Sequence, residues 1–439
     1  KLPPPSFVLN IKFSELQLTE TKATPKEELA ALLTDSASQR MLLRDAVSAI
    51  RAAAVDPRVA GLLAEFGGPE ARGQRSLCSC QEIRDAIRFF REQKEEKAVT
   101  IAYGDNYSSS EYFTACATGR VLCQPGGLVQ LPHLSTTTPF LSNFLKRFGV
   151  AFEAIKRGQY KSAYETYTAS EASKPNRKST TRRLRSSFEQ MLRVLSVERC
   201  LSNKEAACLL SKGVLMAEEA EKDGLIDGAC YLDELIVELR DRCGTETLLS
   251  LPQYHKAVRA ECSRDRLRQT LCKLPGDIVN STRSAVDTSS TWVLGPTTIT
   301  KPLNVDASPT PSTPHQRPSS RNAARNFTAT NGLDNGSDPN RVSVAIVCVV
   351  GEIVRDSSTV QGGSSSRVAS VKEVRRQLQA AASSPSVKAI LLRIDSPGGD
   401  AVASEAIWRE VLQVSKPVVV SMGTYAASGG GMIAAAADK

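Results

Sequence analysis

Apolar positions in the first hundred residues switch between strand-like runs and helical spacing. Residues 7–13 have strand composition and partial alternation, and residues 41–54 place leucine, isoleucine and alanine at helical spacing. The same pattern predicts a strand over 59–66, a helix over 79–94 and a strand over 98–103. Strands that alternate with helices in this way are typical of an α/β domain with largely parallel pairing.

This pattern recurs near the end of the chain. Residues 56–68 align with 384–396, and each stretch follows an alanine-rich helical segment. Residues 98–104 align with 417–423, and each is followed by small residues. The spacing of about 320 to 330 residues predicts two copies of one domain, the second of them incomplete.

Composition separates the two copies. Residues 275–341 are rich in Ser, Thr, Pro, Asn and Gly, and they cannot bury a core, which predicts a disordered insert or linker. The first copy, residues 1–274, then includes a helical extension over about 182–272, and the second copy is residues 342–439.

Charge and cysteine spacing limit the partners and cofactors that we expect. The net charge of +9 is modest for 439 residues and gathers in residues 174–185. We interpret that run as a solvated loop and helix start, with an acidic partner or anionic membrane surface as the alternative; we expect no nucleic acid partner. The eleven cysteines form no C-x-x-C pair, so we expect no metal and no cofactor.

No run of 18 uninterrupted apolar residues occurs, so no transmembrane helix is predicted. The chain begins with Lys1 and ends shortly after a predicted helix, where a strand should follow. We therefore expect that sequence is missing at both ends.

One serine stands where a nucleophile would be well exposed. Ser428 follows the apolar run 417–420 and precedes three glycines, so it lies at a predicted strand-to-helix turn. The backbone N–H of Gly429, together with that of Gly398 or Gly399, could hold an oxyanion beside its hydroxyl. We hypothesise that Ser428 is a nucleophile.

A serine nucleophile needs a group that accepts its proton. The three histidines, His133, His255 and His315, stand in no recognisable catalytic setting. A lysine can replace histidine if its amine is buried and neutral. Lys161 follows an apolar segment, 150–155, that is predicted to be a strand, although by itself it would be interpreted as a surface lysine.

Three separated motifs, residues 157–163, 395–399 and 421–430, together resemble the signal peptide peptidase A family (protease IV) in its long, duplicated form. The resemblance covers most of residues 7–255 and 342–439. It implies tandem domains with the α/β fold of Clp protease and crotonase enzymes, and a Ser/Lys dyad in which Ser428 is the nucleophile and Lys161 the general base.

The resemblance also implies the partners. The expected substrates are remnant signal peptides or other membrane-derived peptides. The expected assembly is a homo-oligomeric ring, associated with a membrane and with its active domain on a non-cytosolic face.

Two departures and two alternatives accompany this interpretation. Gly431 stands where the family usually has an aromatic residue, and Ser109, which aligns with Ser428, precedes Ser110 and Glu111 instead of two glycines. We expect Ser109 to be a structural relic. The alternatives are a crotonase-like acyl-CoA enzyme, which needs no serine nucleophile, and an inactive truncated scaffold or regulatory subunit.

Overall fold

The computed structural model describes residues 6–21, 40–67, 76–94, 98–131, 134–271, 343–355 and 368–439. The predicted insert 275–341 lies outside these residues. The chain divides into two compact units, Lys1–Val258 with Ser337–Lys439, and Arg259–Gly336. Both predicted copies fall almost entirely within the first unit, and the domain limits given above stay predictions.

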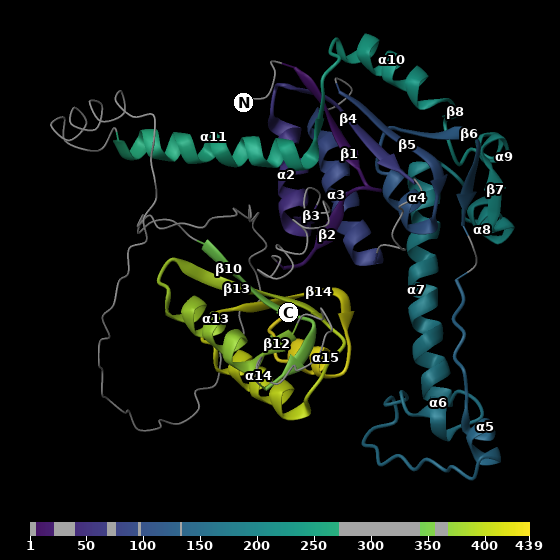
Figure 1. Cartoon of the computed structure of the whole chain (residues 1–439), viewed down its shortest axis with the longest axis vertical. Helices are drawn as coiled ribbons and strands as arrows, with labels where there is room; N and C mark the ends of the chain where they lie inside the picture. Colours follow the sequence, from purple (N-terminus) through teal and green to yellow (C-terminus); the bar gives the residue numbers. More distant parts are fainter. Residues whose placement is uncertain are drawn as a thin grey trace. The chain divides into compact units, whose positions relative to one another are not determined.

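The first copy is built on one mostly parallel sheet with the strand order β7-β6-β5-β4-β1-β9 (Figure 1). The strands are β1 (Phe7–Lys12), β4 (Val59–Phe66), β5 (Val99–Tyr107), β6 (Arg120–Gln130), β7 (Val214–Met216) and β9 (Leu248–Ser250), and β8 (Gly228–Ala229) pairs with β6. Only β7 pairs antiparallel in this sheet. The three predicted strands are therefore confirmed, and their near-continuous apolar sequence fits a sheet that is covered on both faces.

Helices surround this sheet. They are α2 (Leu43–Val55), α3 (Leu77–Lys94), α4 (Ser109–Ala115), α5 (Ser142–Arg147), α6 (Glu165–Thr168), α7 (Lys174–Glu198), α8 (Asn203–Lys212), α9 (Ala217–Lys222), α10 (Leu232–Cys243) and α11 (Leu251–Leu271). The apolar faces of α2 and α3 are buried in the main core with one face of the sheet. Leu235 and Leu239 of α10 belong to a smaller core with the other face. None of the helices in the described part of the chain is long and apolar enough to cross a bilayer.

The second copy repeats the order of elements. Its elements are β10 (Ser343–Val350), β11 (Glu352–Val354), β12 (Val368–Ser370), α13 (Val371–Ser383), β13 (Val387–Ser396), α14 (Ala401–Gln413), β14 (Val418–Ala426) and α15 (Gly429–Ala434). The parallel order β10-β13-β14 matches β1-β4-β5, and the β11–β12 pair matches the pair of β2 (Gln17–Thr19) with β3 (Arg40–Leu42). The carbonyl of Lys439 accepts the N–H of Val420 (2.7 Å), at the place where β6 begins beside β5 in the first copy.

One local prediction was wrong, and another was right only in part. The predicted strand over 150–155 has no regular secondary structure, and its side chains are exposed. An apolar run forms a strand only when another strand supplies hydrogen bonds, and β6 is followed here by a long excursion that contains only α5 and α6. The basic run is helical from Lys174, because the Ser173 hydroxyl caps the first turn and a proline occupies it.

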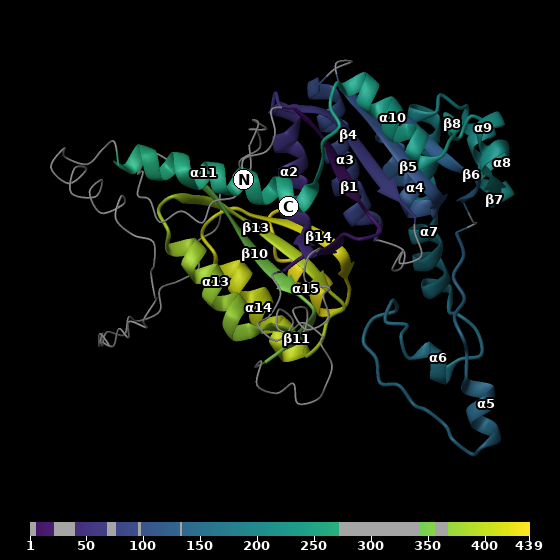
Figure 2. The same cartoon turned by 45° about the horizontal axis from the view of Figure 1, so that its top comes forward.

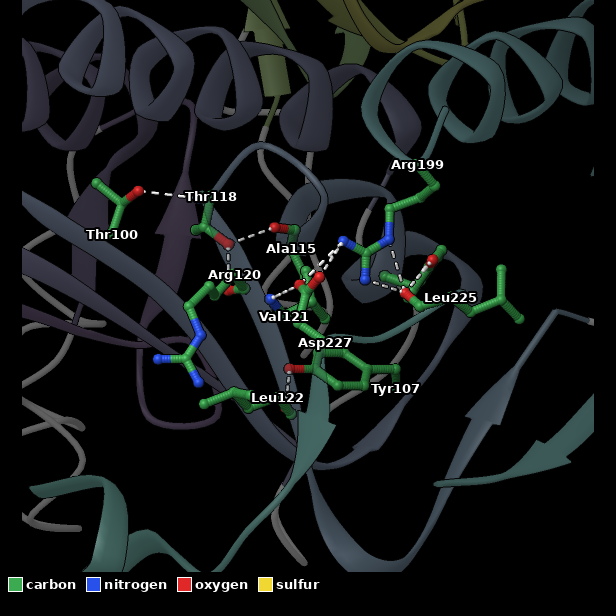
Figure 3. Close-up of polar contacts among 12 residues, drawn as sticks. Thr100, Tyr107, Ala115, Thr118, Arg120, Val121, Leu122, Arg199, Leu225 and Asp227 are labelled. Atoms are coloured by element: carbon green, nitrogen blue, oxygen red, sulfur yellow. Dashed lines mark hydrogen bonds and ion pairs between the residues drawn. The ribbon is translucent and has the colours of Figure 1, made fainter. Parts of the chain in front are cut away.

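The N-terminal half of α7 extends beyond the sheet beside α5 and α6 in both views (Figures 1 and 2). Its other end is fixed by Arg199, which immediately follows the helix. The guanidinium donates to the Leu225 carbonyl (2.9 Å from Nε) and to Asp227 (3.0 Å), as Figure 3 shows. Asp227 in turn accepts the N–H of Val121 on β6 (2.7 Å). This network joins the end of α7 to β6.

Candidate active site

Ser428 occupies a strained turn between β14 and α15. Its backbone angles are φ 49° and ψ −116°, and among the described non-glycine residues only Cys200 also has a positive φ. Such a conformation costs about 1–3 kcal/mol and persists only where the surroundings impose it. A serine on a strained strand-to-helix turn is the arrangement called a nucleophile elbow, which exposes the hydroxyl. The Ser428 side chain is exposed here.

Backbone hydrogen bonds hold this elbow. The Ala427 N–H donates to the Ser396 carbonyl (3.1 Å), and the Met432 N–H donates to the Ser428 carbonyl (3.0 Å). Gly398, with φ +105°, lies directly against the turn: a Cβ added there would be 2.7 Å from the Ser428 Cβ and 2.9 Å from the Gly429 nitrogen. Only glycine fits at this position, both for its φ and for its space.

The predicted oxyanion donors differ in their hydrogen bonds. The Gly398 N–H donates to the Ser396 hydroxyl (3.1 Å), so it is already engaged. Within the described ranges, no hydrogen bond uses the N–H of Gly399 or of Gly429. These two amides therefore have no hydrogen-bond partner among the described residues.

Close packing fixes the backbone around these amides. Gly399 lies beside Ile353, whose N–H donates to the Gly398 carbonyl (2.9 Å), and a Cβ on Gly399 would be 2.2 Å from the Ile353 oxygen. Beneath the elbow, a Cβ on Gly429 would be 2.1 Å from the Oγ of Ser404, which is buried on α14. Neither glycine can be replaced without moving the turn.

Asp395 and Ser396 shape the turn. Asp395 Oδ1 accepts the N–H of Tyr425 (2.8 Å). Ser396 is fully buried beneath the loop that contains Gly398 and Gly399, here called the glycine loop. Burial is the main cause that raises the pKa of the Asp395 carboxyl above its ordinary value. The Asp395 side chain therefore connects the end of β13 to the end of β14, and the Ser396 hydroxyl holds the loop that follows β13.

Arg393 ties this loop to the first copy. Its guanidinium, 10% exposed, contacts Glu20 (2.7 Å) and Glu82 (2.7 Å), and it also donates to the Ser421 hydroxyl (2.7 Å). Sequence reasoning did not find these carboxylates, because Glu20 is 373 residues away along the chain. Burial, despite the nearby guanidinium, raises the pKa of Glu82.

Lys161 is not brought to Ser428. It lies in the irregular segment between α5 and α6, and its side chain is exposed. In the part of the chain that the structure describes, no hydrogen bond or ion pair joins the two residues. Of the histidines, His255 lies on α11, whereas His133 and His315 are outside the described residues.

The corresponding turn in the first copy is built differently. Ser108 is the N-cap of α4 with an ordinary φ of −73°, and Glu111 accepts both its N–H (2.9 Å) and its hydroxyl (2.8 Å). Ser109 donates to the Gln130 carbonyl (3.1 Å). A carboxylate thus occupies the helix start where an oxyanion would need positive potential, which supports the view that Ser109 is a relic.

Two family models match different parts of the chain. The family model of Peptidase family S49 matches residues 91–246, and that of Clp protease matches residues 346–439. The chain is 25% identical over 388 residues to "Serine protease SPPA, chloroplastic" of Arabidopsis thaliana, with 88% of this chain and 46% of that protein covered.

Two bacterial proteins named "Protease 4" are also similar. That of Haemophilus influenzae is 25% identical over 416 residues (94% of this chain, 56% of the relative), and that of Salmonella typhi is 25% identical over 403 residues (91% and 53%). The chain thus spans about half the length of the curated relatives that it matches.

Proposed function

Because the chain belongs to the signal peptide peptidase A family, we propose that it is a serine endopeptidase whose nucleophile is Ser428 and whose general base is Lys161. The observation that carries this proposal is the strained backbone of Ser428, with glycine amides left open beside it. A strain of this kind is retained where exposure of the hydroxyl is useful.

The proposed chemistry follows from the roles given to these residues. Neutral Lys161 accepts the Ser428 proton while Oγ attacks the scissile carbonyl carbon, and the C=O electron pair moves onto the oxygen. The amides of Gly399 and Gly429 hold that oxyanion, and each such donor is worth about 3 kcal/mol of barrier. Collapse breaks the C–N bond as the lysine returns the proton to the leaving amine, and water then releases the acyl group by the reverse sequence.

This mechanism requires that Lys161 be covered, since a lysine in water is protonated at neutral pH. The segment that carries it is rich in exposed apolar side chains: Phe144, Phe148, Phe152, Ile155, Tyr160 and Tyr167. A surface of this kind marks an interaction site. We propose that it is the contact of a homo-oligomer and that assembly desolvates Lys161.

The oligomer can be tested by light scattering. A Phe148→Asp/Phe152→Asp double variant should be smaller in solution than the unsubstituted protein. An unchanged mass would remove this part of the proposal.

The proposed substrates are apolar peptides such as signal-peptide remnants, cleaved at a membrane surface by a domain on its non-cytosolic face. The exposed basic residues of α7 support contact with anionic headgroups. Co-sedimentation with phosphatidylglycerol vesicles, compared with phosphatidylcholine vesicles, tests this contact. Equal sedimentation with the two would count against it.

The crotonase-like alternative is less well supported. Such an enzyme would use the paired glycine loops but has no use for a serine held at a strained φ. The scaffold alternative becomes an outcome of the activity test.

That test is hydrolysis of a fluorogenic leucine-rich peptide by the assembled protein. Ser428→Ala should abolish it, and Lys161→Arg should reduce it at least 100-fold, because an arginine keeps the charge but cannot deprotonate. Lys222→Ala, at an exposed lysine on α9, is the matched control and should retain full rate. Full activity in the Ser428→Ala protein would overturn the assignment.

A further inference from the structure

The first copy contains a cavity of about 990 Å³ beside the start of α4. This volume lies at the upper end of the roughly 300–1,000 Å³ typical of ligand sites. Ser109 and Ser110 line it at the helix start, which is where Ser428 and Gly429 face the substrate in the second copy under the proposed function. The cavity therefore occupies the position of a substrate groove in the duplicated domain.

One face of α7 forms a wall of this cavity. Leu184, Phe188 and Met191 recur at helical spacing and point their apolar side chains into it. Phe113 of α4 and Leu210 of α8 complete the apolar lining. Phe188 is 37% exposed, so apolar surface remains open to a ligand.

The rim of the cavity is basic. Arg183 and Arg185 line it, and the run from Lys174 to Arg185 contains no acidic residue. Arg185 pairs with Glu189 (2.8 Å), whereas the Arg183 guanidinium makes no ion pair within the described ranges. An anionic group at the end of an apolar ligand would complement this rim.

The same helix start cannot catalyse hydrolysis. Glu111 holds Ser108, and Ser109 donates to the Gln130 carbonyl, so neither hydroxyl is poised for attack. This cavity, which we call the groove, thus has an apolar wall, whereas the turn beside it forms no nucleophile elbow.

We infer that this groove is a non-catalytic binding site for apolar peptide segments that end in a free carboxylate. The inference rests on the proposed function for its ligand class, because peptides bearing a new carboxyl terminus are what a peptidase releases. The apolar part of the peptide packs on α7 and Phe113, and the carboxylate lies near Arg183. The first copy then retains peptides that the second copy has cut or is about to cut.

The test uses fluorescence anisotropy with a fluorescein-labelled leucine-rich octapeptide on the full chain carrying Ser428→Ala, which prevents cleavage. Adding Phe188→Glu should weaken binding at least tenfold. Val197→Glu places the same charge on an exposed site of α7 outside the cavity and should leave binding within twofold. Equal binding by the two variants would overturn the site.

The carboxylate is tested separately. Arg183→Gln should weaken the free-acid peptide about fivefold or more and leave its C-terminal amide unchanged. Equal effects on acid and amide would remove the carboxylate from the proposal. Binding of dodecanoate without any peptide binding would show that the ligand is a fatty acid, which would overturn the proposal.

Photo-crosslinking tests the site without any substitution in the groove, so misfolding of a groove variant cannot explain its result. A peptide with a benzoylphenylalanine should crosslink to α7 or α4 in the Ser428→Ala chain, which carries no groove substitution. Crosslinks confined to the second copy would contradict the inference. If the unsubstituted protein hydrolyses no peptide but the Ser428→Ala chain still binds one, the proposed function fails while this binding site stands.

Discussion

Gly398→Ala is a sharp perturbation of the nucleophile turn, because it adds one methyl group at the closest approach between the two loops. The new Cβ would lie 2.7 Å from the Ser428 Cβ and 2.9 Å from the Gly429 nitrogen. Its three nearest atoms are the Ser428 Cβ, the Gly429 nitrogen and the Ala427 oxygen, all of them fixed by the backbone, so no flexible side chain can swing away. Relief must come from a shift of the elbow or of the glycine loop.

The cost has two parts. A non-glycine residue at φ +105° is strained by about 1–3 kcal/mol. Overpacking adds about 1–3 kcal/mol. A displacement of the nucleophile by about 1 Å can lower the rate about 100-fold. We expect kcat/KM to fall at least 100-fold while the protein stays folded with a lower Tm.

Gly224→Ala is the matched control. Gly224 also has a positive φ, +73°, but no atom lies within 4 Å of an added Cβ. Its stability should fall by a similar backbone cost, and its kcat/KM should stay within twofold. The assay is fluorogenic peptide hydrolysis together with thermal unfolding of each variant. Activity of Gly398→Ala within threefold of the unsubstituted protein would refute the packing argument.

Three further predictions concern stability. Arg393→Met leaves two carboxylates without their cation and should lower the free energy of unfolding by about 3 kcal/mol, measured by urea titration; a loss below about 1 kcal/mol would contradict it. Arg199→Met should cost about 2–3 kcal/mol, because a buried carbonyl and Asp227 lose a charged donor; an unchanged urea midpoint would exclude this. The pKa of Glu373 is lowered to about 2 by hydrogen bonds from Arg376 and Gln377, so its stabilisation is present above pH 4.5 and is lost as pH falls toward 2. Glu373→Gln should therefore have a lower Tm than the unsubstituted protein at pH 6 and the same Tm near pH 2. A difference in Tm near pH 2 that vanishes at pH 6 would be inconsistent with this sign.

Periodicity predicted the strands and helices of the first sheet because those elements are apolar on the faces that they bury. Residues 59–66 form β4 as predicted, and β5 begins at Val99 within the predicted range 98–103 and continues to Tyr107. The failure at 150–155 has a physical cause: strand composition describes a preference, whereas a strand also needs a neighbour, and none of the strands in the described part of the chain pairs with this segment.

The candidate site was predictable where it is local. Ser428 and its glycines stand at a strand-to-helix boundary, and the structure adds the strained φ that no composition reveals. The sequence could not show which glycine amides are free to bind an oxyanion. The Gly398 N–H donates to the Ser396 hydroxyl, and this hydrogen bond depends on the path of the loop. The carboxylates around Arg393 are far away along the chain and gave no sequence signal.

Covalent labelling of the assembled protein by a fluorophosphonate, read by peptide mapping in a mass spectrometer, tests directly whether Ser428 is the nucleophile. We expect one adduct, on Ser428, which disappears in Ser428→Ala and forms much more slowly in Lys161→Arg. Ser109 should remain unlabelled. An adduct on another serine, or undiminished peptide hydrolysis by the Ser428→Ala protein, would contradict the account.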